Sequence, residues 1–374
     1  MEFRDLKIQY YRNKDKIDDA VRKVMESGSF IGGESVEKLE RRLAAYVGTK
    51  YCITCANGTD ALQLALMAWG IGEGDVVYVP DFTFFSTGEV VPWVGGTPAF
   101  VDIDPDTFNI SAVSLEQAIQ KTLEEGRLRP KAIIAVDLFG RPADFPAIKN
   151  IAKKYHLLVL EDGAQGFGGR IREQRACSFG DISTTSFFPA KPLGCYGDGG
   201  AVFTDNDEWA ELIRSYKIHG KGKNKYDNIR LGMNSRLDTI QAAILNIKLD
   251  FFEEYELEAV NKAAAEYEKC LSHILRVPVI TKEFYSSWAQ YTILTDGEQQ
   301  RELIQSGLRR EGIPSMIYYP KGLHKQEAMK KWVSGKEDCS VTEDVSKRCL
   351  SLPMHPYLSK EEIERVSSCI ERLL

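Results

Sequence analysis

Several features that mark other classes of protein are missing from this sequence. No apolar run approaches the roughly 18 to 20 residues that a membrane-spanning helix requires. The opening stretch MEFRDLKIQYYRNKDKIDDA is charged throughout and has no apolar segment followed by a small-residue cleavage site, so we expect no signal peptide. The sequence therefore predicts a cytoplasmic protein without a membrane partner.

An excess of positive charge is also missing. The chain has 48 Lys and Arg residues against 54 Asp and Glu residues, which gives a formal net charge of -6. Binding to nucleic acid depends on a basic field that neutralises phosphates, and this composition supplies none over the whole molecule. We therefore expect no nucleic-acid partner.

Cysteines in metal-binding or disulfide patterns are scarce. Eight cysteines are scattered over 374 residues, a chain too long to need disulfide staples, and this usage fits a reducing compartment. Only Cys52 and Cys55 form a C-x-x-C pair, which can indicate a metal or redox site. The stretch KYCITC is typical of a strand, however, where side chains three positions apart point to opposite faces, and no second pair supplies further ligands. We expect no metal site.

What is present between about residues 34 and 205 is an alternation of helical and extended patterns, which is typical of an α/β fold. The helical stretch ESVEKLERRLAAYVG ends at Gly48, a residue suited to a helix C-terminus. We predict a mostly parallel sheet of about seven strands between helices. The predicted strands are KYCITC, DVVYVP, TPAFVDID, KAIIAVDLFG, LLVLED, DISTTSFF and GAVFTD.

After residue 230 the pattern changes. The segment SRLDTIQAAILNIKLDFFEEY predicts a long helix that bridges two domains, with one apolar stripe made of Leu237, Ile240, Ile244, Ile247 and Phe251. Strands are predicted at WAQYTIL and PSMIYY, and a last helix at SKEEIERVSSCIERLL. We therefore predict a large α/β domain over residues 1–248 and a smaller α+β domain over residues 249–374.

Three stretches carry residues suited to chemistry. In CANGTDAL, Gly58 and Thr59 open a helix directly after a strand, where free N–H groups and the helix dipole favour an anion, although an ordinary helix cap has the same pattern. In LLVLEDGAQGFGG, a buried strand leads into Asp162 and Gln165, although an Asp before a Gly is also a common turn.

The third stretch is SFFPAKPLGCYGDGG, which places Lys191 among aromatic residues, prolines and glycines and five positions after Ser186. A lysine in apolar surroundings has a lowered pKa and forms Schiff bases, whereas a surface lysine on a Gly-rich loop has no such role. A phosphate cradle, a strand-end Asp and a Schiff-base lysine together meet the needs of a pyridoxal 5'-phosphate (PLP) enzyme.

These stretches also resemble a known family. The motifs NGTDAL, PDFTFFST, EDGAQGFGG, SFFPAKPLGCYGDGG, IHGKG, MNSRLDTIQAAIL, YYPKGLHKQ and SLPMHPYL occur in an order similar to that of the DegT-like nucleotide-sugar aminotransferases of PLP fold type I. The resemblance runs from about residue 5 to the C-terminus. It implies a homodimer with shared active sites at the subunit interface.

The resemblance also implies roles for individual residues. Lys191 is the Schiff-base residue and moves the proton, and Asp162 pairs with the pyridine nitrogen. Gln165 hydrogen-bonds the ring oxygen and Phe84 stacks on the ring. The phosphate is held by Gly58, Thr59, Ser186 and, from the partner subunit, Asn234. Substrate contacts are expected from Ile31, Gly32, Arg236, Tyr318 and His324.

The implied reaction has two halves. An amino acid, in this family usually L-glutamate, leaves as 2-oxoglutarate and converts PLP to pyridoxamine 5'-phosphate (PMP), which then aminates a nucleotide-diphosphate ketosugar. The amino-acid sequences of the motifs are most similar to those of enzymes that act on UDP-2-acetamido-2-deoxy-3-oxo-glucuronate. These enzymes serve the synthesis of surface polysaccharides such as O-antigen. C4 aminotransferases of UDP- or dTDP-4-keto-6-deoxysugars share nearly all of the motifs and stay an alternative.

Two further alternatives belong to other classes, a PLP lyase and a non-catalytic sugar-binding regulatory protein. Some relatives carry histidine in place of the lysine and are sugar dehydratases, so Lys191 favours transamination. Gly163 is a small departure, because alanine is more usual there in the family. For the basic loop HGKGKNKYDNIR, a solvated surface is the preferred interpretation of His219, Lys221, Lys223, Lys225 and Arg230.

Overall fold

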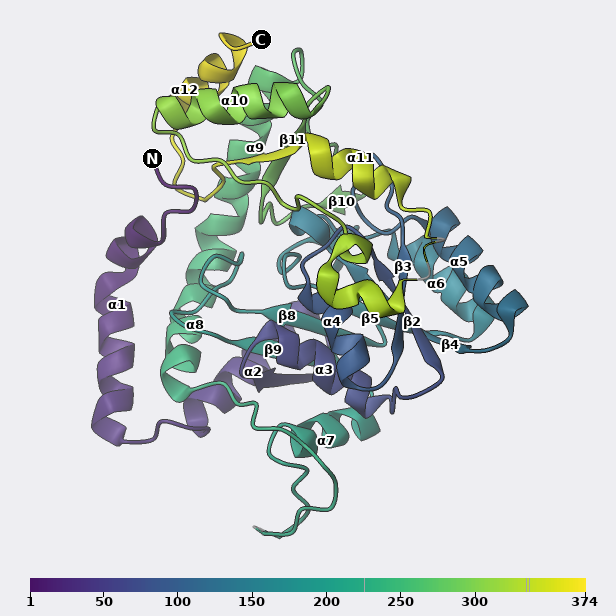
Figure 1. Ribbon diagram of the computed structural model, residues 1–374. Coiled ribbons are helices and arrows are strands. Elements are labelled where there is room, and N and C mark those ends of the chain that lie inside the picture. Colours follow the sequence, from purple (N-terminus) through teal and green to yellow (C-terminus); the bar gives the residue numbers. More distant parts are fainter. Residues whose placement is uncertain (225, 334, 336) are drawn as a thin grey trace.

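The computed structural model describes residues 1–224, 226–333, 335 and 337–374 (Figure 1). Its centre is a seven-stranded sheet with the order β1-β9-β8-β5-β4-β2-β3. Every neighbouring pair from β8 to β3 is parallel, whereas β9 is antiparallel to both β8 and β1. The strands are β1 (Tyr51–Cys55), β2 (Asp75–Pro80), β3 (Thr97–Val101), β4 (Arg129–Val136), β5 (Leu158–Asp162), β8 (Ile182–Ser186) and β9 (Gly200–Thr204).

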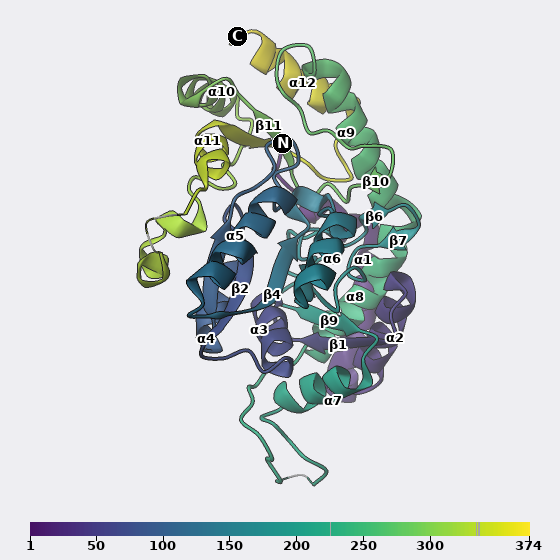
Figure 2. The ribbon, with the colours of Figure 1, turned by 90° about the vertical axis from the view of Figure 1, so that its right-hand side faces the viewer.

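Helices cover both faces of this sheet, because the strands are apolar on both sides (Figure 2). One face packs against α3 (Gly58–Ala68), α4 (Ser86–Trp93) and α7 (Asp207–Tyr216). The other face packs against α5 (Ala112–Glu125) and α6 (Phe145–Tyr155) and, nearer β1, against α2 (Glu34–Val47) and α8 (Thr239–Phe251). The seven predicted strands and the mostly parallel sheet are confirmed.

The C-terminal part of the chain forms a separate apolar cluster. It combines α9 (Leu257–Leu271), α10 (Glu298–Arg310) and α12 (Lys360–Glu371) with a two-stranded antiparallel sheet of β11 (Tyr291–Leu294) and β12 (Cys349–Leu352). The remaining elements are α1 (Leu6–Ser27), α11 (Ser340–Arg348), the short strands β6 (Arg170–Ile171), β7 (Gln174–Arg175) and β10 (Phe284–Tyr285), and the single turns η1 (Leu138–Gly140), η2 (Phe252–Glu256), η3 (Leu323–Lys325) and η4 (Glu327–Trp332).

Two expectations for this region were wrong. The stripe predicted for the long helix is incomplete, because Ile240, Ile247 and Phe251 are only half-buried while the polar Asn246 and Lys248 are buried. The helix packs against both α1 and α2, so no single apolar stripe describes it. PSMIYY forms only an isolated bridge, from Met316 to Ser351, and the strand that pairs with β11 is β12 instead.

The α8 helix continues through the π-helical turn η2 into α9, so one helical rod runs from the central sheet to the C-terminal cluster (Figure 1). The boundary predicted at residue 248 falls inside α8, and the division into two domains stays a prediction. Among the described residues, no helix is long and apolar enough to cross a membrane.

The Cys52–Cys55 pair has no ligand geometry. Both thiols are free and buried, and they belong to different apolar clusters, Cys52 beside α2 and α8 and Cys55 beside α3. Their side chains thus lie on opposite faces of β1, as the alternation of a strand requires.

Candidate active site

The predicted cofactor residues gather where the parallel strands end. Asp162 is the last residue of β5 and Ser186 is the last residue of β8. Because β1 and β8 are both antiparallel to β9, β1 ends at the same edge of the sheet, and Gly58 opens α3 there. This edge is where open α/β sheets bind ligands.

Asp162 and Lys191 form the electrostatic centre of the site. The Asp162 carboxylate is 5% exposed and accepts hydrogen bonds from Thr87 Oγ1 at 2.8 Å and from the Ala164 N–H at 3.2 Å. Burial raises the pKa of Asp162, while these hydrogen bonds and the Lys191 ammonium oppose that rise. Burial also lowers the pKa of Lys191, with the Asp162 carboxylate opposing and the Arg4 cation adding to the decrease. The lysine therefore has more of the neutral, nucleophilic amine than an exposed lysine has.

The start of α3 is suited to a phosphate. The Asn57 side chain caps Asp60 N at 2.8 Å, and the N–H groups of Gly58 and Thr59 donate to no described residue. A Cβ added at Gly58 would lie 2.7 Å from Ser186 Cβ, so only glycine lets the start of α3 approach the end of β8 this closely. Free N–H groups at a helix start, beside a serine hydroxyl, fit an anionic phosphate.

An aromatic and amide wall completes this group. Phe84 is 55% exposed, and its ring centroid lies 6.5 Å from that of Tyr319. The Gln165 amide donates to the Tyr319 hydroxyl at 3.1 Å and accepts from the Phe139 N–H at 2.7 Å. The exposed phenyl ring offers a face on which a planar heterocycle can stack, and it lies three residues before Thr87, which donates to the buried Asp162 carboxylate. Neither Thr87 nor Tyr319 was predicted, although Thr87 lies three residues after Phe84 in the motif PDFTFFST and Tyr319 directly follows Tyr318.

Two further buried carboxyl groups, those of Glu161 and Asp137, lie close to the site. Glu161 is fully buried, and its Oε2 accepts from Phe179 N at 2.6 Å and from Ser183 Oγ at 2.7 Å. Asp137, at the end of β4, is equally buried, and its Oδ2 has no hydrogen-bond partner among the described residues. Burial and the Glu161 charge raise the pKa of Asp137 well above its ordinary value. We assign the negative charge to Glu161 and the proton to Asp137.

Four predicted residues lie apart from this group. Ile31 bridges Asp238, and Gly32 O accepts from Thr239 Oγ1 at 3.0 Å. Asn234 is exposed, and Arg236 lines a hollow of about 970 Å³ together with His219, Lys221 and Arg230. The loop containing these residues projects beyond α7 (Figures 1 and 2). Lys225 lies outside the described residues.

His324 has both ring nitrogens engaged. Its Nδ1 lies 2.6 Å from Asp81 Oδ2 and its Nε2 lies 3.2 Å from Glu343 Oε1. The hydrogen bond with Asp81 raises the pKa of His324. Tyr318 is half-buried, and burial raises its pKa. In this arrangement His324 has no free nitrogen for a substrate, so its predicted contact requires the ring to exchange a partner.

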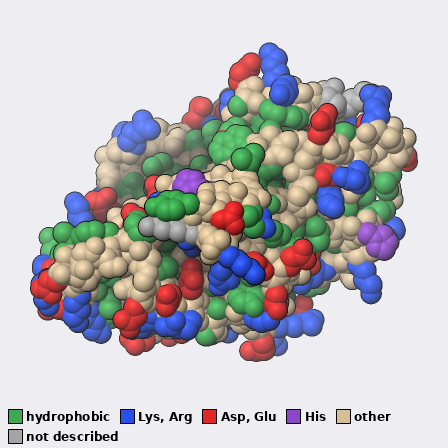
Figure 3. Space-filling model, turned by 90° about the horizontal axis from the view of Figure 1, so that it is seen from below, with side chains coloured by type: hydrophobic (Ala, Val, Ile, Leu, Met, Phe, Trp, Pro, Cys, Tyr) green, Lys and Arg blue, Asp and Glu red, His purple; other side chains and the backbone are tan. Residues whose placement is uncertain are grey.

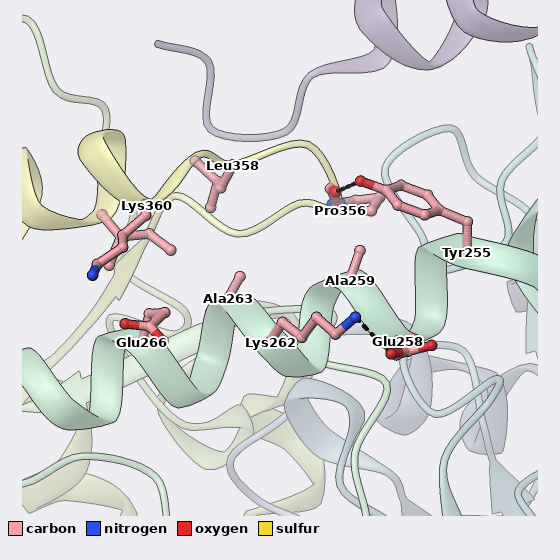
Figure 4. A pocket seen from close by; sticks show the side chains of 10 residues that line it. Tyr255, Glu258, Ala259, Lys262, Ala263, Glu266, Pro356, Leu358 and Lys360 are labelled. Carbon is pink, nitrogen blue, oxygen red and sulfur yellow. Dashed lines mark hydrogen bonds and ion pairs between the residues drawn. The ribbon is translucent and has the colours of Figure 1, made fainter.

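One further surface groove carries none of the predicted residues. A groove of about 360 Å³ between α9 and the segment before α12 is lined by Tyr255, Lys262 and Leu358, among others (Figure 4). Its Lys262 is paired with Glu258 at 2.6 Å. Seen from below, the molecule shows side chains of both charge signs intermixed with apolar ones (Figure 3). The candidate active site is therefore the group of residues at the ends of the parallel strands.

Comparison with known proteins gives full-length matches. The model of the DegT/DnrJ/EryC1/StrS aminotransferase family matches residues 12–371. UDP-2-acetamido-2-deoxy-3-oxo-D-glucuronate aminotransferase of Pseudomonas aeruginosa is 46% identical over 371 residues, covering 99% of both chains. UDP-N-acetyl-3-dehydro-alpha-D-glucosamine 3-aminotransferase of Acidithiobacillus ferrooxidans is 39% identical, covering 99% of this chain and 97% of that protein.

Two solved structures are similar over nearly the whole chain. A DegT DnrJ EryC1 StrS aminotransferase from Brucella abortus has a TM-score of 0.97 and 47% identity, covering 100% of this chain and 99% of that one. The ntda protein of Bacillus subtilis, solved with bound cofactor PMP, has a TM-score of 0.87 and 29% identity, covering 97% and 82%. These neighbours confirm the predicted fold.

Proposed function

Because the chain belongs to the DegT/DnrJ/EryC1/StrS aminotransferase family, we propose that it aminates the C3 keto carbon of UDP-2-acetamido-2-deoxy-3-oxo-D-glucuronate. The observation that carries the substrate is the 46% identity, over 99% of both chains, to an enzyme of that name. The second relative is also named for amination at C3, which favours C3 over the alternative C4 reaction on a 4-keto-6-deoxysugar.

The enzyme is a PLP-dependent aminotransferase of nucleotide sugars, and the residues at the strand ends fit that cofactor. Gly58, Thr59 and Ser186 would hold its phosphate, and Asp162 would face its ring nitrogen. Bound PLP supplies a carbonyl carbon that takes up an amine and a ring that accepts electrons.

The chain's own residues supply the proton chemistry. Lys191 Nζ, with its lowered pKa, would move a proton from the amine-bearing carbon of the donor to the cofactor in the first half, and from the cofactor to the sugar carbon in the second half. The buried Asp162 carboxylate, with Thr87 as donor, would keep the ring nitrogen protonated. Phe84 and Tyr319 would cover the ring and exclude water from the reacting carbon.

We further propose a homodimer whose sites are shared. Leu231 is 93% exposed and Ile229 56% exposed on the same projecting loop, and apolar side chains this exposed favour a partner surface. Asn234, Arg236, Ile31 and Gly32 lie in or beside this loop and would reach the partner's site.

The proposal includes glutamate as the amino donor and a role in the synthesis of surface polysaccharide or O-antigen. It also includes a cytoplasmic location, because eight free cysteines suit a reducing compartment.

The absorption spectrum tests the reaction class. The purified protein with PLP should show a visible band that glutamate bleaches, and Lys191→Ala should lack this band. A colourless wild type under saturating PLP would favour a binding or regulatory protein, and a band that no amino acid bleaches would favour a lyase.

A panel of ketosugars tests the substrate. The PMP form is mixed in turn with the UDP-3-oxo-uronate and with UDP- and dTDP-4-keto-6-deoxysugars, and products are identified by mass. Amination of the 3-oxo-uronate alone supports the proposal, whereas amination of a 4-keto sugar alone replaces it with the C4 reaction.

A further inference from the structure

The first residues of the chain run along the candidate site, although the family model begins only at residue 12. Arg4 Nη2 donates to Lys191 O at 2.8 Å and to Pro192 O at 3.4 Å. The Phe3 ring lies edge-on to Tyr318 at 6.2 Å, and Phe3 O accepts from Met354 N at 3.1 Å. This segment therefore joins the backbone of the Schiff-base lysine to a residue predicted to contact the substrate.

The Arg4 guanidinium lacks an ionic partner. Among the described residues it forms no ion pair, and its Nε and Nη1 atoms donate no hydrogen bond. The Glu256 carboxylate raises the pKa of Arg4, but it already accepts hydrogen bonds from Gln9 Nε2 and from the Tyr357 hydroxyl. Arg4 is half-buried, and a guanidinium partly withdrawn from water is stabilised when an anion pairs with it.

A buried cation increases this imbalance. Lys248 is 2% exposed, and its Nζ has no hydrogen-bond partner among the described residues. Arg4 and Lys248 repel each other, and both are attracted by the single Glu256 carboxylate. Arg4 and Lys191 also repel each other. Lys191, Arg4 and Lys248 thus make three positive groups against the two carboxylates of Asp162 and Glu256, which suits a ligand that brings a negative charge.

We propose that Arg4 binds a carboxylate of the substrate next to Lys191. Its planar fork with free N–H donors matches a carboxylate, which accepts two parallel hydrogen bonds. The inference rests on the proposed function, in which both substrates carry this group: the amino donor has its α-carboxylate and the sugar has its uronate carboxylate. The two sources are distinguished by measuring each half-reaction separately.

The test compares wild type with Arg4→Gln, Arg4→Lys and the control Arg12→Gln. Arg12 belongs to the same N-terminal part but lies over the Tyr357 ring, at 4.8 Å from its centroid. For the donor, the affinity is the glutamate concentration that half-saturates bleaching of the visible band in one turnover. For the sugar, calorimetry on the PMP form compares UDP-2-acetamido-2-deoxy-glucuronate with UDP-N-acetylglucosamine, which has a hydroxymethyl group in place of the carboxylate.

Arg4→Gln should lower the affinity for one of the two carboxylate ligands by about 10- to 100-fold, which is the range for a hydrogen bond to a charged group. The affinity for UDP-N-acetylglucosamine should not change. Arg4→Lys should retain part of the affinity, and Arg12→Gln all of it. Weakening of glutamate alone assigns the donor carboxylate, and weakening of the uronate alone assigns the sugar.

If Arg4→Gln lowered the affinities for the uronate and for the neutral sugar equally, Arg4 would only hold the N-terminal segment in place, and the inference would be overturned. It would also be overturned if neither half-reaction changed. Failure of the proposed function is separate, because then wild type itself would show neither bleaching by glutamate nor binding of the UDP-sugars.

Discussion

Thr87 Oγ1 donates a 2.8 Å hydrogen bond to Asp162 Oδ2 inside the molecule, and both residues are at most 5% exposed. This bond joins the first turn of α4 to the end of β5, 75 residues apart in sequence. It favours the ionised carboxylate in a place where burial favours the neutral acid. Thr87 thus supports the charge that a protonated ring nitrogen needs.

Thr87→Val removes this donor with little change in volume. The pKa of Asp162 should rise further, so the acid limb of the kcat/KM profile should move to higher pH, and PLP affinity should fall roughly tenfold. Thr185→Val is the matched control, because Thr185 is equally buried but donates to Gly163 O at 3.1 Å. A profile that does not move in Thr87→Val would contradict this role.

Lys191 should react as an amine at lower pH than an ordinary lysine. In trace acylation of the cofactor-free enzyme, followed by peptide mass, the midpoint for Lys191 should lie below the usual lysine value, because burial lowers its pKa. Exposed Lys262, whose pKa is raised by its hydrogen bond with Glu258, should have a midpoint above that value. Asp162→Asn should move the Lys191 midpoint down further. Equal midpoints for the two lysines would refute the assigned environment.

Gly163 has a packing reason that the sequence did not reveal. A Cβ at this position would lie 2.6 Å from Cys177 Sγ and 3.0 Å from Thr184 O, so the thiol occupies the space of the missing methyl group. Gly163→Ala should lower the free energy of unfolding by about 1 to 3 kcal/mol, the cost of overpacking. The double variant Gly163→Ala, Cys177→Ala should recover most of this loss in urea unfolding. If the losses of unfolding free energy in the two single variants simply added up in the double variant, the thiol would not occupy the space of the missing methyl group.

Asp137 should make stability depend on pH. Its pKa in the folded state is raised by burial and by the Glu161 charge, so its contribution is complete below the unfolded value of about 3.9 and is lost as the pH rises through the folded value. Asp137→Asn has no proton to release. The unfolding free energy of wild type should therefore fall relative to that of the variant as the pH rises from about 4 to about 9. A difference that is flat over this range would show that Asp137 is ionised throughout.

Local patterns predicted the seven strands, because each is a short apolar run between turn residues. They also placed Asp162 at a strand end, where the structure has it, and Ser186 in a strand that was predicted to run to Phe188 but ends at Ser186. Contacts between distant segments were not predictable in this way. Thr87 reaches Asp162 and Arg4 reaches Lys191 only through the packing of α4 and the N-terminal segment.

The errors have the same origin. The buried faces of α8 depend on α1 and α2 lying on different sides of it, and β12 is a strand because it pairs with β11. The roles of Asn234 and Arg236 depend on a second copy of the chain, and they stay predictions. The order of the motifs nevertheless identified the family, because these motifs are spread over nearly the whole sequence.

Transfer of labelled nitrogen tests the central claim most directly. The enzyme is incubated with PLP, [¹⁵N]glutamate and UDP-2-acetamido-2-deoxy-3-oxo-glucuronate, and the sugar product is analysed by mass and NMR, with Lys191→Ala as control. We predict a 3-amino sugar that carries ¹⁵N on C3, formed by wild type and not by the variant. Absence of ¹⁵N from every ketosugar offered, or equal transfer by Lys191→Ala, would contradict the account.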